Sequence, residues 1–133
     1  MERIKDVGLA ECAKEYPLKF SGGMKRRAAI ARALVLQPRI LLMDEPFESL
    51  DKQNRDNVQK TMRSVCEKYG ISILLVTHST EDAVAMSDRI ILMDEKPGRI
   101  KTIIENKAKD ASPAVRAEFI EELDKMLDNK DTL

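Results

Sequence analysis

Two adjacent carboxylates follow a short apolar run, and they are the pair best suited to chemistry. Asp44 and Glu45 come directly after the run Ile40–Met43. Such a run is typical of a strand covered on both faces, and the carboxyl ends of such strands open into the crevice where α/β sheets bind ligands. An aspartate there can hold Mg²⁺, directly or through water, and a glutamate can orient or deprotonate an attacking water. Taken alone, an acid pair after an apolar run is more often a solvated junction between strand and loop.

A serine followed by two glycines stands at the predicted start of an alanine-rich helix. These residues are Ser21, Gly22 and Gly23. The free N–H groups and the dipole of a helix start favour an anion, the glycines let a phosphate approach the backbone, and the serine adds a hydroxyl. A single Ser-Gly-Gly triplet is more often a loop and a helix cap.

The only histidine, His78, follows a second apolar run that covers residues 71–77. An isolated histidine is usually structural or on the surface. If the two runs form adjacent parallel strands, however, Asp44, Glu45 and His78 lie on one rim of the sheet. That arrangement would suit contact with a terminal phosphate and with the water that attacks it.

Alternating elements must position these residues. Helices are predicted within residues 1–16, 21–36, 51–69, 81–86 and from 112 onward, and strands at 40–43, 71–77, 89–93 and 100–104. The turn signal Pro97-Gly98 separates the last two strands. Strands that alternate with helices predict an α/β layer architecture with right-handed crossovers.

Composition narrows the class of protein. The chain has 133 residues, the size of one domain, and a formal net charge of zero, which does not support a broad nucleic-acid footprint. No apolar run approaches the ~18 residues that span a bilayer, and residues 1–6 lack the apolar core of a secretory signal. Cys12 and Cys66 have no metal-ligand spacing, so buried or free thiols are predicted.

Five segments, in order, resemble the motifs of ABC-type ATPases over roughly residues 1–105. Phe20–Met24 resembles the signature motif, and Arg27–Leu34 is similar to the helix that follows it. The other three are Ile40–Pro46, which resembles Walker B, Ser49–Asp51, which resembles the D-loop, and Thr77-His78, which resembles the switch histidine. The resemblance implies a partial P-loop NTPase fold, with a mostly parallel sheet flanked by helices.

The resemblance also implies a role for each matching residue. Asp44 would help to hold Mg²⁺, Glu45 would polarise the attacking water, and His78 would contact the γ-phosphate side of ATP. Asp51 would couple the two ATP sites of a head-to-tail dimer. ATP held by the opposite ATPase subunit would contact the signature residues Ser21, Gly22, Gly23 and Met24. Phe20, Met24 and Glu48 depart from the commonest residues of the family, but none of these departures removes a reacting group.

The later segments narrow the type of transporter. Residues 86–93 and 96–100 are similar to the ATPases of nitrate, sulfonate and taurine importers. This resemblance implies transmembrane permease subunits as partners, a solute-binding protein as an indirect partner, and a peripheral place on the cytoplasmic face of the membrane. No nucleic-acid partner is expected.

Two features of the family have no match here: the Q-loop glutamine, because Gln37, Gln53 and Gln59 all lie after the signature, and the P-loop. The P-loop needs glycine, four residues and then Gly-Lys-Ser/Thr, but none of the five glycines here is followed by lysine. We therefore expect a C-terminal portion of such a subunit, in which residues 1–36 are a remnant of the helical subdomain. Residues 37–105 would be the C-terminal part of the ATPase core and 106–133 a helical tail.

Two consequences and two alternatives follow from that expectation. The chain alone is expected neither to bind ATP tightly nor to hydrolyse it, and its incomplete sheet is expected to leave apolar edges and faces exposed. One alternative is a non-catalytic partner that supplies the signature motif in trans. The other is a soluble ABC-type ATPase of DNA repair or translation, which the neutral charge and the Pro-Gly-Arg-Ile segment disfavour.

Overall fold

The computed structural model describes residues 2–94 and 98–128, which pack as two compact units, Met1–Val76 and Thr77–Leu133. Each unit is described by itself. This division by packing does not test the three-part assignment to 1–36, 37–105 and 106–133, which stays a prediction. No helix within the described ranges is both long enough and apolar enough to cross a membrane.

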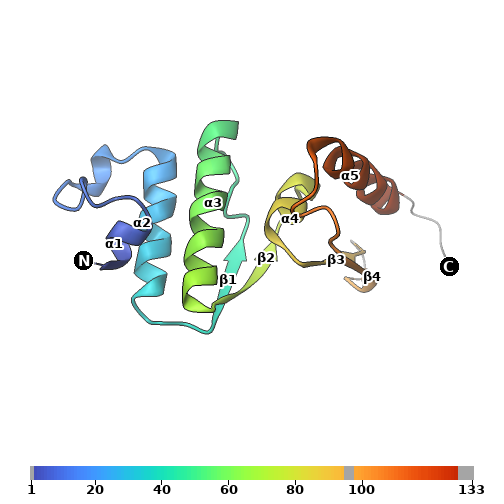
Figure 1. Cartoon of the computed structure of the whole chain (residues 1–133), viewed down its shortest axis with the longest axis horizontal. Coiled ribbons are helices and arrows are strands. Elements are labelled where there is room, and N and C mark those ends of the chain that lie inside the picture. Colours follow the sequence, from blue (N-terminus) through green and yellow to red (C-terminus); the bar gives the residue numbers. More distant parts are fainter. Residues whose placement is uncertain (1, 95–97, 129–133) are drawn as a thin grey trace. The chain divides into compact units, whose positions relative to one another are not determined.

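The first unit sets helices beside a pair of parallel strands (Figure 1). Its elements are α1 (Glu2–Asp6), the 3₁₀ turn η1 (Pro17–Lys19), α2 (Gly22–Leu34), β1 (Ile40–Asp44), α3 (Lys52–Tyr69) and β2 (Ser72–Val76). Helix α2 packs against both α1 and α3. Strands β1 and β2 are parallel neighbours, with Ile40 opposite Ser72 and Asp44 opposite Val76. The two apolar runs therefore form adjacent parallel strands, as predicted.

Helix α1 is shorter than the predicted N-terminal helix. It ends before Gly8, whose φ of +69° is the left-handed conformation that commonly terminates a helix. Val7 and Leu9 are buried beyond it, as expected of inward positions. Ala13, also predicted to face inward, is exposed, because the chain past Gly8 continues as turns.

Helix α2 ends at Leu34, two residues before the predicted end. The N–H groups of the next three residues bond to carbonyls three positions back, and Gln37 adopts a φ of +50° ahead of Pro38. This tightening turns the chain toward β1 and leaves Leu36 exposed.

Helix α3 agrees closely with its predicted limits. The Asp51 side chain caps its start, and Gly70 ends it with a φ of +62°. Its buried face holds Val58, Met62, Val65 and Cys66. Cys12 and Cys66 are both free thiols, and burial raises the pKa of the Cys66 thiol.

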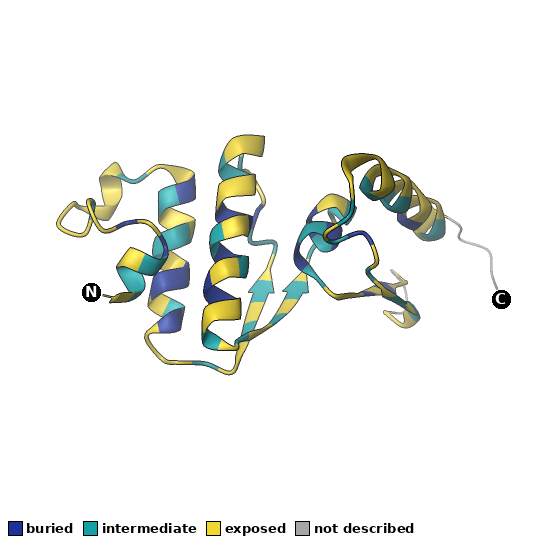
Figure 2. Cartoon of the chain, viewed as in Figure 1, coloured by how far each residue is buried: buried dark blue, intermediate teal, exposed yellow. Residues whose placement is uncertain are grey.

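Only one face of the β1–β2 pair is covered, contrary to the prediction of a strand covered on both faces. Burial alternates along both strands (Figure 2). Leu41 and Met43 are half-buried and line a cavity with side chains of α2 and α3. The opposite face, which we call the open sheet face, consists of Ile40, Leu42, Leu74 and Val76, which are 53–70% exposed. In the described part of this unit, the helices cover a single side of the sheet.

The second unit contains a helix, an antiparallel strand pair and a final helix. These are α4 (Thr80–Met86), β3 (Arg89–Met93), β4 (Ile100–Glu105) and α5 (Pro113–Asp128). Their core consists of Val84, Ile90, Leu92, Ala108 and Leu123. Ser112 caps α5 as predicted, accepting from the Val115 N–H at 3.4 Å. Val115 and Leu127, placed in the apolar stripe of this helix by prediction, are exposed. Residue 97 of the predicted Pro97-Gly98 turn lies outside the described residues.

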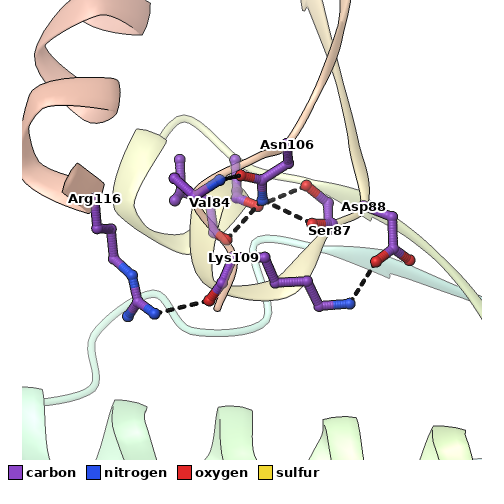
Figure 3. A network of polar contacts seen from close by, with 8 residues as sticks. Val84, Ser87, Asp88, Asn106, Lys109 and Arg116 are labelled. Atoms are coloured by element: carbon purple, nitrogen blue, oxygen red, sulfur yellow. Dashed lines mark hydrogen bonds and ion pairs between the residues drawn. The ribbon is translucent and has the colours of Figure 1, made fainter. Parts of the chain in front are cut away.

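Asn106 joins the end of β4 to the end of α4 (Figure 3). Its Nδ2 donates to the Val84 carbonyl at 2.8 Å and to the Ser87 carbonyl at 2.7 Å, and its Oδ1 accepts from the Ala108 N–H at 3.1 Å. The last carbonyls of a helix have no partner within the helix. One amide side chain thus satisfies two carbonyls at the carboxyl end of α4.

Candidate functional site

The acid pair lies where the two parallel strands of the first unit end. Asp44 is the last residue of β1, and the N–H of Glu45 donates to the Val76 carbonyl, the last of β2, at 2.9 Å. Asp44 is exposed and Glu45 is half-buried. The structure therefore places both carboxylates at the carboxyl edge of the sheet, the edge at which open α/β sheets bind ligands.

Glu45 has an unusual backbone conformation. Its φ is +43°, in the left-handed region that costs a non-glycine residue about 1–2 kcal/mol. The Glu48 N–H closes a turn onto the Glu45 carbonyl at 3.3 Å, and the side chain of Phe47 is only 1% exposed. The buried Phe47 anchors the turn that holds Glu45 in this conformation, directly after a regular strand residue.

The Ser-Gly-Gly turn is the N-terminus of α2. Ser21 is extended (φ −62°, ψ 166°), and its Oγ accepts from the Met24 N–H at 3.2 Å. Ser21 and Gly22 are exposed, Gly23 is buried and Met24 is half-buried. The first N–H groups of a thirteen-residue helix thus begin at an exposed surface, which is the arrangement predicted for anion contact.

Asp51 caps α3 and is held by Asn54. The Asn54 N–H donates to Asp51 Oδ1 at 3.0 Å. This backbone hydrogen bond, followed by one from the Asn54 side chain, lowers the pKa of the Asp51 carboxyl. The approach to this cap is strained as well, since Ser49 has a φ of +64°.

The turn before α3 faces the start of α2 across an open cavity of about 390 Å³, lined by Gly22, Lys25, Arg26, Ala29, Glu48, Ser49 and Leu50. The structure therefore brings the Ser-Gly-Gly turn and the Ser49–Asp51 segment together, although they lie far apart in the sequence. The acid pair belongs to the same unit.

His78 belongs to the second unit. It is exposed and follows β2, in a turn where the Ser79 N–H donates to Thr77 Oγ1 at 3.1 Å. Its place on one rim with Asp44 and Glu45 stays a prediction.

Asp44 could bind Mg²⁺ at the end of β1 only together with oxygen ligands from a nucleotide or water. Within the described ranges, no group of three or more His, Cys, Asp or Glu side chains could hold a metal ion. Mg²⁺ is usually bound through one or two carboxylates together with phosphates and water, and not in an all-protein cage. An exposed Asp44 meets that requirement if a nucleotide supplies the remaining oxygens.

Comparison with known proteins adds independent evidence. The sequence profile of the family described as "ABC transporter" matches residues 1–48. The chain is 47% identical over 95 residues to the aliphatic sulfonates import ATP-binding protein SsuB 3 of Pseudomonas savastanoi, covering 71% of this chain and 35% of that protein. It is 43% identical over 96 residues to the nitrate import ATP-binding protein NrtC of Synechococcus elongatus, covering 72% and 15%.

The resemblance to the ATP-binding subunits of ABC transporters is confirmed. The fold agrees as well. A chain of an ABC transporter of the metal-chelate type, solved in an inward-facing conformation, matches with a TM-score of 0.71 and 24% identity over 90% of this chain and 46% of that one. The chain spans less than half the length of the curated relatives that it matches. The predicted ABC ATPase fold is thereby confirmed, whereas the roles of single residues stay predictions.

Sequence reasoning missed Asn54, which lies against Gly23 of the Ser-Gly-Gly turn and donates its N–H to Asp51. A lone asparagine in the first turn of a helix carries no pattern of its own. The available signal was its spacing, three residues after the capping Asp51, because the residue at that position donates its N–H to the cap.

Proposed function

We propose that this chain is part of the ATP-hydrolysing subunit of an ABC importer for nitrate, a sulfonate or a similar small anion. The observation that carries the proposal is the pairing of β1 with β2, which sets Asp44 and Glu45 at the carboxyl edge of a parallel sheet. The exposed start of α2 in the same unit supports it, and the names of the sulfonate and nitrate relatives suggest the class of solute.

Each residue then has a role. Asp44 helps to hold Mg²⁺. Glu45 polarises the attacking water, and His78 contacts the γ-phosphate side of ATP. Asp51 couples the two sites, and the residues Ser21, Gly22, Gly23 and Met24 contact ATP held by a second ATPase subunit. Bound Mg²⁺ would neutralise charge that develops on the phosphates. Permease subunits would hold the ATPase at the cytoplasmic face of the membrane, and a solute-binding protein would act through them.

The first experiment measures ATP binding by calorimetry and phosphate release with the purified chain. Because no glycine here is followed by lysine, the amides and the lysine of a P-loop are lacking. We therefore expect neither tight binding nor turnover. Turnover that the pure chain sustains, and that Glu45→Gln abolishes, would contradict this expectation.

A second candidate function is that of a non-catalytic partner that supplies its signature turn in trans. The observation in its favour is that the capped, exposed start of α2 is complete within the first unit. The test mixes the chain with an ATPase subunit that has a P-loop and an inactivated signature. Hydrolysis restored by the unaltered chain, but not by Ser21→Arg, supports this function. No restoration at any ratio excludes it.

A further inference from the structure

Asn54, in the first turn of α3, holds both oxygens of the Asp51 carboxylate. Its backbone N–H donates to Oδ1 at 3.0 Å, and its side-chain Nδ2 donates to Oδ2 at 2.5 Å. The backbone bond alone would cap the helix. The additional side-chain bond prevents the carboxylate from rotating about its own axis, so Asn54 fixes the direction in which Asp51 points.

The same side chain lies against the signature turn. A Cβ added to Gly23 would lie 2.9 Å from Asn54 Oδ1, closer than real Cβ atoms approach, and 3.3 Å from Asn54 Cγ, which is tighter than most Cβ contacts. Gly23 is buried and its neighbour Gly22 is exposed. A Cβ on Gly22 would meet nothing nearer than Leu50 Cδ2, at an ordinary 3.6 Å. Of the two glycines, Gly23 is the one whose missing side chain makes room for Asn54.

We infer that Asn54 is a positioning residue that links the signature turn to the D-loop. One end of its amide packs on Gly23 at the start of α2, and the other end holds the Asp51 carboxylate at the start of α3. A shift of either segment must therefore move the other or break the hydrogen bond to Asp51. The link itself rests on geometry, and its use in catalysis rests on the function proposed above.

The chemistry of the amide explains why this residue suits both contacts. A leucine or alanine at position 54 would pack on Gly23 but leave Asp51 Oδ2 without its donor. An aspartate would have nearly the same shape, but it would set a second carboxylate against Asp51, and like charges destabilise each other's ionised form. Asparagine combines a short planar shape with a neutral donor.

The test measures the pKa of Asp51 by NMR titration of its side-chain carbonyl in the full chain. Asn54→Ala should raise this pKa part of the way toward the ordinary value of 3.8, since the N–H of residue 54 still donates. Gly23→Ala should raise it to a similar extent, because the new methyl group pushes the amide away. Gly22→Ala, which adds the same methyl group one residue earlier, should leave the pKa unchanged.

The double variant Asn54→Ala/Gly23→Ala tests whether the two substitutions act on Asp51 through the same contact. With Asn54→Ala already present, adding Gly23→Ala should produce no further shift, because the link is gone. Additive shifts, or a Gly23→Ala variant that leaves Asp51 unchanged, would overturn the inference. The NMR chemical shift of the Asn54 side-chain amide allows the Gly23→Ala and Gly22→Ala variants to be compared at neutral pH as well. Gly23→Ala should move it and Gly22→Ala should not.

Catalytic use is tested in the mixture with a P-loop-bearing subunit. Asn54→Ala should lower kcat and leave the KM for ATP unchanged, because Asn54 positions Asp51. An unchanged kcat would refute a role in catalysis. If the unaltered chain stimulates no hydrolysis, its function as a partner in trans fails, and the Asp51 titration still decides whether the link exists.

Discussion

At the scale of single residues, the backbone after β1 carries two left-handed conformations in quick succession. Glu45 has a φ of +43° and Ser49 a φ of +64°, and the buried Phe47 lies between them. Each such conformation costs a non-glycine residue about 1–2 kcal/mol. Conformations of this kind persist where the surrounding structure enforces them, and they are frequent at functional sites. Here the strained backbones are those of Glu45, which is proposed to act on water, and of Ser49, the first residue of the predicted D-loop.

The strain at Glu45 can be measured by comparing two substitutions that both remove the carboxylate. Glu45→Gly should be more stable than Glu45→Ala by about 1 kcal/mol, because glycine avoids the left-handed penalty but loses about 0.5–1 kcal/mol through its greater flexibility. Urea unfolding of the two variants gives the difference. The same pair at Glu48, whose backbone is not left-handed, should show the opposite order. A Glu45→Gly variant that is less stable than Glu45→Ala, as expected at position 48, would show that the backbone of Glu45 is unstrained.

At the scale of elements, two polar contacts between distant segments hold helix ends in place. In the first unit, Asp6 of α1 accepts from Lys68 Nζ at 2.7 Å and from the Tyr69 hydroxyl at 2.6 Å. Arg3 lies 3.7 Å above the centre of the Tyr69 ring. In the second unit, Asn106 satisfies the last carbonyls of α4. Both contacts compensate for short helices that could not persist alone.

The Asp6 contact should make stability depend on pH. The hydrogen bond from Lys68, then that from Tyr69, lowers the pKa of the Asp6 carboxyl below its ordinary 3.8. A lowered pKa in the folded state means that the stabilisation is fully present above about pH 4 and is lost as the pH falls through the folded value. The stability advantage of the unaltered chain over Asp6→Asn should therefore shrink as the pH falls below about 4. Urea unfolding at several pH values measures it, with exposed Asp56→Asn as control.

Removing the Asn106 contact should lower the stability of the second unit. Asn106→Ala leaves the carbonyls of Val84 and Ser87 without this donor, and each such loss costs about 1–3 kcal/mol when the group cannot reach water. Because Val84 is fully buried and Ser87 is half-buried, we expect a total loss of about 2–4 kcal/mol in urea unfolding. Asn57→Ala, at an exposed position of α3, is the matched control. A loss no larger than that of the control would show that water replaces the amide.

Most elements were predictable from the sequence because their signals are local. Ser21, Asp51 and Gly70 cap their helices as their residue types indicate, and the apolar runs became the parallel strands. The coverage of those strands was not predictable, because an apolar run does not reveal how many neighbours it has. The contacts of Asn54 and Asn106 were not predictable either, because each depends on a segment that only the fold brings near.

At the scale of the whole molecule, the open sheet face is the main departure from an ordinary soluble domain. Leu42 and Leu74 lie opposite each other in the register and are 70% and 53% exposed. Contiguous apolar surface of this kind usually marks an interaction site or promotes association. The sequence predicted exposed apolar faces, and each strand pair has one: besides the open sheet face, Ile91, Met93, Ile100 and Ile103 of β3 and β4 are 47–60% exposed.

We expect the chain to self-associate through the open sheet face. Leu42→Lys should shift sedimentation toward the monomer, because a charge on this face opposes apolar contact between copies and the side chain is already mostly outside the core. Leu18→Lys makes the same change at a leucine that is 93% exposed on η1, away from the sheet, and should have no effect. A chain that sediments as a monomer at every concentration, with a sharply cooperative melt, would contradict the expectation.

The hydrogen bond between Asp6 and Tyr69 also has a consequence during protein synthesis. The two residues are separated by 63 positions, and ribosomes add about 5–20 residues each second, so roughly 3–13 s pass between the synthesis of Asp6 and that of its partner. During that interval α1 has no α3 to hold it. Until the end of α3 has been synthesised, α1 can pack only against α2.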